Sequence, residues 1–282
     1  MRPADRLPPA FVPKKRLGQN FLVDRHVIAR VVDACSFSLE ETVLEIGPGQ
    51  GALTREILPR VKAVIAVEAD RALADSLAIE VPGPHLQVHQ ADILKFDLSL
   101  LPRPIKVVGN IPYNISTPII VRVMENRRMF TTLFITVQHE FGMRLVAVPG
   151  TKDYSSLSCF VQMFGVPRIL FKISPAAFRP APKVVSCFMR IDLRHDKPAE
   201  DVWNEACFIR VVRTAFQQRR KNLLNSLAAF APKDRLALLF KAAGIDPQAR
   251  AENLTIAQYA RIANGLHGSL PVDEPAAGGI IL

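Results

Sequence analysis

The sequence predicts an α/β protein in which a mostly parallel sheet is covered by helices and followed by a small C-terminal helical domain. Short apolar runs alternate with stretches of helical periodicity over the first half of the chain. The apolar runs are continuous, as in strands that are buried on both faces. The pattern changes after Asp192, and beyond it the chain is helical as far as Leu266.

The individual elements are assigned from their period and from the residues that flank them. Strands are expected where apolar residues stand together between Gly, Pro, Asp or Asn, and helices where they recur every three or four positions. Thr117 and Pro118 mark one helix start, because threonine caps helices and proline suits the first turn. The expected order is helix Val27–Ala34, strand Thr42–Ile46, helix Leu53–Leu58, strand Ala63–Val67, helix Arg71–Ile79, strands Leu86–Val88 and Ile105–Val108, helix Pro118–Glu125, strand Leu133–Val137, and then two β-rich segments, Leu157–Ile173 and Val184–Ile191, that close the sheet as a hairpin.

Four parts of the chain follow from these patterns. The chain has 282 residues, of which 49% are hydrophobic, which is enough for one large domain and one small one. We expect a proline-rich, flexible arm over 1–13, the sheet domain over 14–194, a helical domain over 195–268 that begins in a charged linker, and a flexible tail over 269–282.

Charge and cysteine usage narrow the classes of function. The formal net charge of +10 favours nucleic acid or another anionic surface as the partner. The cysteines are scattered without metal-ligand spacing, so we expect neither a metal site nor a disulfide framework; they are Cys35, Cys159, Cys187 and Cys207. No apolar run is long enough to span a membrane and the first residues lack a signal-peptide core, so the expected location is cytoplasmic.

A glycine-rich turn follows the first predicted strand. Gly47 and Gly49 stand between that strand and the next helix, where glycine lets the backbone turn sharply and approach a ligand. The second strand ends at Glu68, about 20 residues further on, where Rossmann-like folds place a carboxylate for ribose hydroxyls. A further strand is followed by Asp92 and Ile93. Together these residues predict a nucleoside-binding site at one edge of the sheet.

S-adenosylmethionine suits this site better than a dinucleotide does. Pro48 and the glycine spacing depart from the dinucleotide fingerprint, and S-adenosylmethionine has no phosphate that needs a helix N-terminus. Glu68 could accept from the ribose diol, and Asp92 from the adenine amino group. Asp92 could instead be a helix cap, and this alternative stays open.

Several motifs in sequence order resemble the rRNA adenine N6-methyltransferases. They are Gly18-Gln-Asn-Phe-Leu22, Glu45-Ile-Gly-Pro-Gly49, Asn110-Ile-Pro-Tyr113 and Phe178-Arg-Pro-Ala-Pro-Lys183. Val212 to Lys221 and Arg250 to Leu254 resemble the small-subunit rRNA dimethyladenosine transferases within that group, and the match runs from about Lys14 to Leu266. The resemblance implies a Rossmann-like, S-adenosylmethionine-dependent methyltransferase domain. It places cofactor contacts at Asn20, Leu22, Gly47, Glu68, Asp92 and Asn110, to which we add Gly49 and Ile93.

The Asn110–Tyr113 motif suits methyl transfer to an exocyclic adenine amine. A turn would explain its backbone but not Asn110 at a strand end, nor Tyr113. The amine is a poor nucleophile because its lone pair is delocalised, and acceptors for its N–H groups would draw the nitrogen towards a tetrahedral shape. The Asn110 side chain and the Ile111 carbonyl could accept, with Pro112 stiffening the backbone. Tyr113 could stack on the base, and Phe178 could form the second wall, with an apolar anchor for its loop as the alternative.

A basic segment is the predicted RNA-binding element. Ile209–Asn225 contains five basic residues and no acidic one, with interspersed apolar positions, which predicts a helix with one face on the core and one towards phosphates. A solvated face with no ligand is the alternative explanation. The predicted RNA-binding residues are Lys14, Lys15, Arg16, Arg213, Arg219, Arg220 and Lys221.

The resemblance implies dimethylation of two adjacent adenosines near the 3′ end of small-subunit rRNA. The expected partner is that rRNA within an immature ribosomal particle, the expected donor is S-adenosylmethionine without a metal, and we expect a monomer. The alternatives are a large-subunit rRNA resistance methyltransferase, a non-catalytic ribosome-assembly factor that binds RNA, and, as a weaker option, a DNA adenine methyltransferase.

Overall fold

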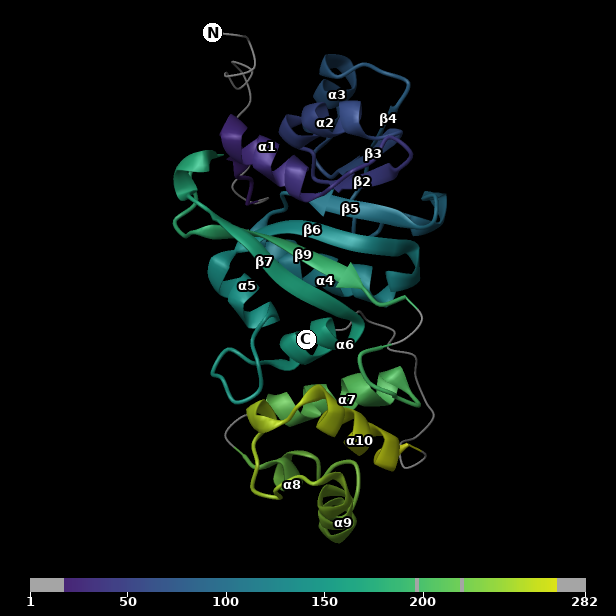
Figure 1. Cartoon of the computed structure of the whole chain (residues 1–282), viewed down its shortest axis with the longest axis vertical. Helices are drawn as coiled ribbons and strands as arrows, with labels where there is room; N and C mark the ends of the chain where they lie inside the picture. The colour runs from purple at the N-terminus through teal and green to yellow at the C-terminus, as the bar shows by residue number, and fades with distance from the viewer. Residues whose placement is uncertain (1–17, 196–197, 219–220, 268–282) are drawn as a thin grey trace. The chain divides into compact units, whose positions relative to one another are not determined.

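The computed structural model describes residues 18–195, 198–218 and 221–267 (Figure 1). They divide into two compact units. The first runs to Gly142 and includes Arg168–Leu193; the second comprises Met143–Pro167 and the described residues from Arg194 onward. The predicted arm and tail, and also Lys14, Lys15, Arg16, Arg219 and Arg220, lie outside the described residues. The predicted four-part division of the chain stays a prediction.

A seven-stranded sheet forms the framework of the first unit. The strand order is β4-β3-β2-β5-β6-β9-β7 (Figure 1). The pairs β2–β3, β3–β4, β2–β5 and β5–β6 are parallel, and β9 is antiparallel to β6. The strands are β2 (Thr42–Ile46), β3 (Ala63–Glu68), β4 (Leu86–Gln90), β5 (Ile105–Gly109), β6 (Phe130–Gln138), β7 (Gly165–Ile173) and β9 (Ser186–Leu193). The predicted mostly parallel, Rossmann-like sheet is therefore confirmed.

Helices cover both faces of this sheet because its strands are apolar on both sides. Val43 belongs to a core cluster with residues of α1 (Arg25–Ala34) and α2 (Ala52–Ile57). Its neighbour Leu44 points to the other face, towards α4 (Ser116–Glu125), where both line the same small void. Helix α3 (Arg71–Glu80) follows β3 and begins at the capping side chain of Asp70. Alternate residues of β2 therefore face α2 and α4 in turn.

A separate two-stranded sheet joins distant parts of the first unit. β1 (Phe21–Leu22) pairs antiparallel with β8 (Phe178–Arg179). The sequence did not predict this pairing, since two-residue strands carry no period. It brings the Gly18–Leu22 motif beside the proline-rich loop that begins at Ser174.

The predicted strand over Leu157–Ile173 is wrong in its first half. Ser156–Phe164 forms the helix α6, and only Gly165–Ile173 is the strand β7. Ser155 and Ser158 form a capping box that starts the helix, which a strand prediction overlooks. A short apolar run cannot be assigned to strand or helix from its period alone. Helix α5 (His139–Leu145) was also not predicted.

The second unit is helical, as the sequence predicted for the region after Asp192. It contains α6, α7 (Glu205–Gln217), α8 (Leu223–Ser226), α9 (Lys233–Ala243) and α10 (Ile256–Leu266). The predicted continuous helix over Ile209–Asn225 is wrong, because α7 ends at Gln217 and the Asn222 side chain caps a new helix. Tyr259 of α10 is fully buried, and its hydroxyl donates to the Ala251 carbonyl at 2.7 Å. Among the described helices, none is long and apolar enough to cross a membrane.

Candidate active site

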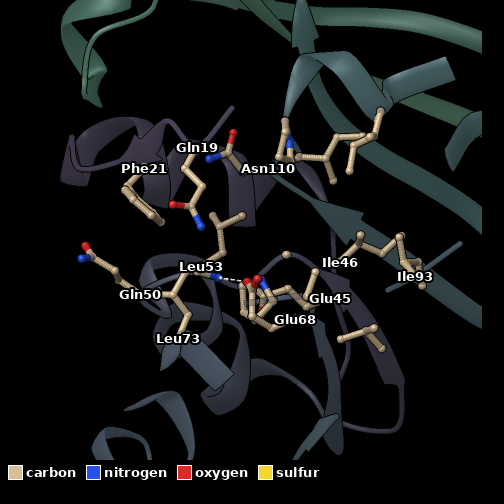
Figure 2. A pocket seen from close by; sticks show the side chains of 18 of the residues that line it. Gln19, Phe21, Glu45, Ile46, Gln50, Leu53, Glu68, Leu73, Ile93 and Asn110 are labelled. Atoms are coloured by element: carbon tan, nitrogen blue, oxygen red, sulfur yellow. Dashed lines mark hydrogen bonds between the residues drawn. The ribbon is translucent and has the colours of Figure 1, made fainter. Parts of the chain in front are cut away.

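A cavity of about 140 Å³ opens at the carboxyl ends of the parallel strands. Parallel strands bring their carboxyl ends to one edge of a sheet, so loops that are distant in sequence meet there. Figure 2 shows Glu45 and Glu68 next to one another on one side, and Gln19 and Asn110 on the other. The lining residues that the sequence predicted for the site are Asn20, Leu22, Gly47, Gly49, Glu68, Asp92, Ile93, Asn110, Ile111 and Pro112.

The glycine turn is shaped by left-handed backbone conformations. Gly47 has φ +65° and Gly49 has φ +57°, a region that residues with a side chain rarely adopt. A Cβ atom on Gly49 would lie 3.0 Å from the ring of Phe21, whereas one on Gly47 would meet nothing within 4 Å. Glycine at both positions thus keeps the turn tight and leaves space at the cavity wall.

Glu68 is held in place by the backbone on either side of it. It is 6% exposed, and its two oxygens accept from the N–H groups of Gly49 at 3.0 Å and Asp70 at 2.9 Å. Burial raises the pKa of this carboxyl, and the two N–H groups oppose that rise. Each carboxylate oxygen has a second lone pair, so Glu68 can still accept from a ligand hydroxyl.

Glu45 is a second acidic residue of the cavity. It begins the Glu45–Gly49 motif but was not among the predicted site residues. It is 1% exposed on β2 and lines the cavity, and its carboxylate accepts from the Thr54 hydroxyl at 2.7 Å. Burial raises the pKa of Glu45 to about 7, and the negative charge of Glu68 adds to the rise. A charged residue inside an otherwise apolar strand was the signal that could have identified it.

Asp92 and Ile93 lie at the end of β4, where the sequence placed them. Both line the cavity. The Asp92 carboxylate accepts from the Leu94 N–H at 2.9 Å and so closes a local turn. This side-chain-to-backbone bond is of the kind that the helix-cap alternative expected. A carboxylate has acceptor sites to spare, and this bond is compatible with a ligand contact.

Asn110 is oriented by a residue 90 positions earlier in the chain. Its side-chain nitrogen donates to the Asn20 carbonyl at 3.1 Å. A carbonyl only accepts, so the amide nitrogen must face it, and the Asn110 side-chain oxygen is left as an acceptor. Asn20 is itself fixed by a bond from its side chain to the Gly18 carbonyl at 3.1 Å.

Tyr113 lies at the start of a short helical turn, Tyr113–Ile115, directly after Pro112. Its ring is half-buried, and its hydroxyl and that of Ser186 are 2.6 Å apart. Burial raises the pKa of Tyr113, and the hydrogen bond with Ser186 partly opposes this. Tyr113 does not line the cavity described above, although Asn110, Ile111 and Pro112 do.

The structure does not bring Phe178 to the cavity. Its ring is fully buried in the core of the first unit, in one cluster with Val108, Phe134 and Phe188. β8 holds it there by pairing Phe178 with Leu22. The structure therefore agrees with the anchor alternative, and stacking of Phe178 on a base would require the ring to leave this core. That role stays a prediction.

Two of the predicted RNA-binding residues are described. Arg213 is half-buried on α7, and Lys221 is exposed in the segment between α7 and α8. Arg210, one turn before Arg213, is exposed and lies over the ring of Phe230 at 5.4 Å. The described basic residues thus reach solvent from more than one element.

Within the described part of the chain, no group of three or more His, Cys, Asp or Glu residues could hold a metal ion. The four cysteines are free and buried. The expected absence of a metal stays a prediction.

The chain is similar in sequence to known proteins over most of its length. The family model described as ribosomal RNA adenine dimethylase matches residues 10–267. The ribosomal RNA small subunit methyltransferase A of Chlorobium luteolum is 44% identical over 264 residues, covering 93% of this chain and 92% of that protein. The protein of the same name from Aromatoleum aromaticum is 42% identical over 261 residues, covering 92% and 96%.

Two solved structures share the fold over most of the chain. The 23S rRNA methyltransferase ErmE superposes with a TM-score of 0.69 at 30% identity, covering 88% of this chain and 100% of that one. A dimethyladenosine transferase from Plasmodium falciparum superposes with a TM-score of 0.75 at 22% identity, covering 87% and 97%.

Proposed function

Because the chain belongs to the ribosomal RNA adenine dimethylase family, we propose that it transfers methyl groups to N6 of two adjacent adenosines near the 3′ end of small-subunit rRNA. The product is N6,N6-dimethyladenosine, and the donor is S-adenosylmethionine. The substrate is small-subunit rRNA within an immature ribosomal particle in the cytoplasm, and the enzyme acts as a monomer. The proposal rests above all on one observation: Asn110 lines the cavity that the glycine turn shapes, and its side-chain nitrogen is bonded to the Asn20 carbonyl, which leaves its oxygen as an acceptor.

The cavity fits the chemistry of the donor. S-adenosylmethionine supplies an activated methyl group on a sulfonium, and it also carries an ammonium group and a ribose diol. Glu45 is buried and lines the cavity, where its carboxylate accepts from the Thr54 hydroxyl, so a cationic ligand would complement its charge. Glu68, held by two backbone N–H groups, would accept from the diol.

Asp92, Ile93, Asn20 and Leu22 complete the proposed donor site. Asp92 would accept from the adenine amino group of the donor, beside the apolar side chain of Ile93. Leu22 is 3% exposed and closes the cavity from the strand β1. The position of each residue on the cavity wall supports these assignments.

The target amine would be held by acceptors on the loop after β5. The Asn110 side-chain oxygen and the Ile111 carbonyl would each accept an N–H, and Pro112 limits the backbone freedom of this loop. Such bonds favour a tetrahedral nitrogen and place its lone pair in line with the methyl group. Positioning of this kind contributes much of the acceleration when a reactive group is already activated. Tyr113 offers the flat face on which the base stacks.

The test is methyl transfer from labelled S-adenosylmethionine to isolated ribosomal subunits that lack the modification. We expect the label in small subunits, as N6,N6-dimethyladenosine after nucleoside analysis, and none in large subunits. Label in large subunits alone would instead support the resistance-methyltransferase alternative. The similarity to the 23S rRNA methyltransferase ErmE is the reason to test it. Donor binding without any transfer would support the non-catalytic alternative.

A further inference from the structure

Tyr113 follows β5 and is bonded to β9, which lies two places further along the sheet. Its hydroxyl lies 2.6 Å from the hydroxyl of Ser186, which is the first residue of β9 and is completely buried. The two residues are 73 positions apart, so only the fold brings them together. Of the residues on the loop after β5, Tyr113 is the one that the proposed function places against the target base.

Ser186 stands on rigid structure. It pairs with Gln138 at the end of the β6–β9 ladder. The carbonyl of the preceding residue, Val185, accepts from the His139 N–H at 2.9 Å. Tyr113, by contrast, lies in a single short turn and is half-buried. A ring on such a turn can change its tilt unless its far end is held.

Resting on the proposed function, we propose that Ser186 is a positioning residue, whose hydroxyl fixes the tilt of the Tyr113 ring so that the target adenine stacks with its amine towards Asn110. The serine does not touch the substrate. Its hydroxyl holds the Tyr113 phenol oxygen and thereby restricts changes in the orientation of the Tyr113 ring. Removal of either hydroxyl would leave the stacking face intact but would let it move.

The two hydroxyls should therefore be coupled in turnover. Ser186→Ala and Tyr113→Phe should each lower kcat by about threefold to tenfold, the usual net worth of one hydrogen bond. Combining the two should give no greater loss than either alone, because both remove the same bond. The dissociation constant for S-adenosylmethionine should not change in any of the three proteins.

The same strand pair offers a matched control. Thr132 of β6 also donates from its hydroxyl, to Asp192 of β9 at 3.4 Å, at the opposite end of the ladder. Thr132→Val removes this hydroxyl with little change of shape, and its kcat should equal that of the wild type. A loss in Thr132→Val equal to that in Ser186→Ala would show a general effect on the β6–β9 pair and would overturn the proposal.

A spectroscopic measurement keeps this inference separate from the proposed function. The chain has three tyrosines, so a sample labelled with ¹³C at the tyrosine Cζ gives few signals, and Tyr113→Phe identifies one of them. Ser186→Ala should shift that signal alone. An unchanged signal, or losses of kcat that multiply in the double variant, would overturn the positioning role even if methyl transfer to small subunits is found.

Discussion

On the proposed cofactor side of the site, Glu68 accepts from two backbone N–H groups, whereas Phe178, which the sequence predicted for the target side, is buried in the core and does not line the cavity. The cofactor side is built from the ends of parallel strands and from the glycine turn between them. The target side is built from a loop after β5, and its best-placed aromatic, Tyr113, is held by one hydrogen bond.

The two sides differ in how far the backbone of the sheet fixes their side chains. Strand ends and tight turns fix their polar groups through backbone bonds, so we expect the proposed cofactor side to be formed before the ligand binds. An aromatic slot for a base needs two faces with a gap between them, and a protein core closes such gaps by packing. We therefore expect the substrate RNA itself to contribute to shaping the target side.

The largest effect is expected at Phe178 and concerns stability. Phe178→Ala should lower the free energy of unfolding by about 3–5 kcal/mol, because it leaves a cavity in a packed core. Denaturant unfolding of both proteins measures this. Phe178→Leu should cost less stability, and its methylation rate per folded molecule then tests stacking. If Phe178→Ala were as stable as the wild type, the ring would not be a core residue, and the contrast drawn between the two sides of the site would be wrong.

Asn110→Ala should abolish most turnover. Removing one preorganised hydrogen-bonding group from an active site commonly costs about 100-fold to 1,000-fold in kcat. Binding of rRNA should be nearly intact, since the variant keeps the basic residues. Asn110→Asp retains an acceptor oxygen and should keep more activity than Asn110→Ala. Equal turnover in wild type and Asn110→Ala would remove Asn110 from the catalytic step.

Glu45→Gln should change the pH dependence of stability. With a folded-state pKa of about 7 against 4.5, the native protein binds more protons than the unfolded chain between these values, so its stability falls as pH rises through that window. Glutamine does not ionise and can still accept from Thr54. The variant should gain up to about 3 kcal/mol over wild type at pH 8, given about 1.4 kcal/mol per pKa unit, and little at pH 4. Parallel pH profiles of unfolding would contradict this.

Glu68→Ala should weaken binding of S-adenosylmethionine by about 10-fold to 100-fold, because a charge-assisted hydrogen bond is worth roughly 1.5–3 kcal/mol. Calorimetry measures the affinity, and Glu68→Gln serves as the milder comparison because it keeps one acceptor. If a folded Glu68→Ala protein bound the donor as wild type does, Glu68 would not belong to the donor site and the cofactor side would need another anchor.

The smallest effect per residue is expected in the basic segment. Joint replacement of Arg219, Arg220 and Lys221 by Ala should weaken rRNA binding and reduce the log–log salt slope by up to about 1 per lost phosphate contact. Donor affinity should stay the same. Joint replacement of the exposed Lys233, Arg235 and Lys241 on α9 by Ala removes the same number of positive charges and serves as the comparison. An unaltered salt slope in the triple variant would make this segment an ordinary solvated surface.

Local signals in the sequence were sufficient for much of the fold and the cofactor side. The strands Thr42–Ile46 and Ala63–Val67 were predicted almost to the residue, because continuous apolar runs between turn residues are a short-range pattern. The glycine turn and Glu68 come at the ends of those two strands, Asp92 comes two residues after β4, and all of them line the cavity. Order along the chain fixes these positions, since each lies at the end of its own strand.

The tertiary structure decided what depends on contacts between distant residues. An apolar run such as Leu157–Phe164 suits helix or strand, and its burial as part of α6 is a result of the fold. The bonds from Asn110 to Asn20 and from Tyr113 to Ser186 join residues 90 and 73 positions apart. The raised pKa of Glu45 and the burial of Phe178 are likewise results of what surrounds each side chain. A sequence specifies side-chain chemistry and local period, but desolvation and long-range hydrogen bonds exist only once the chain has folded.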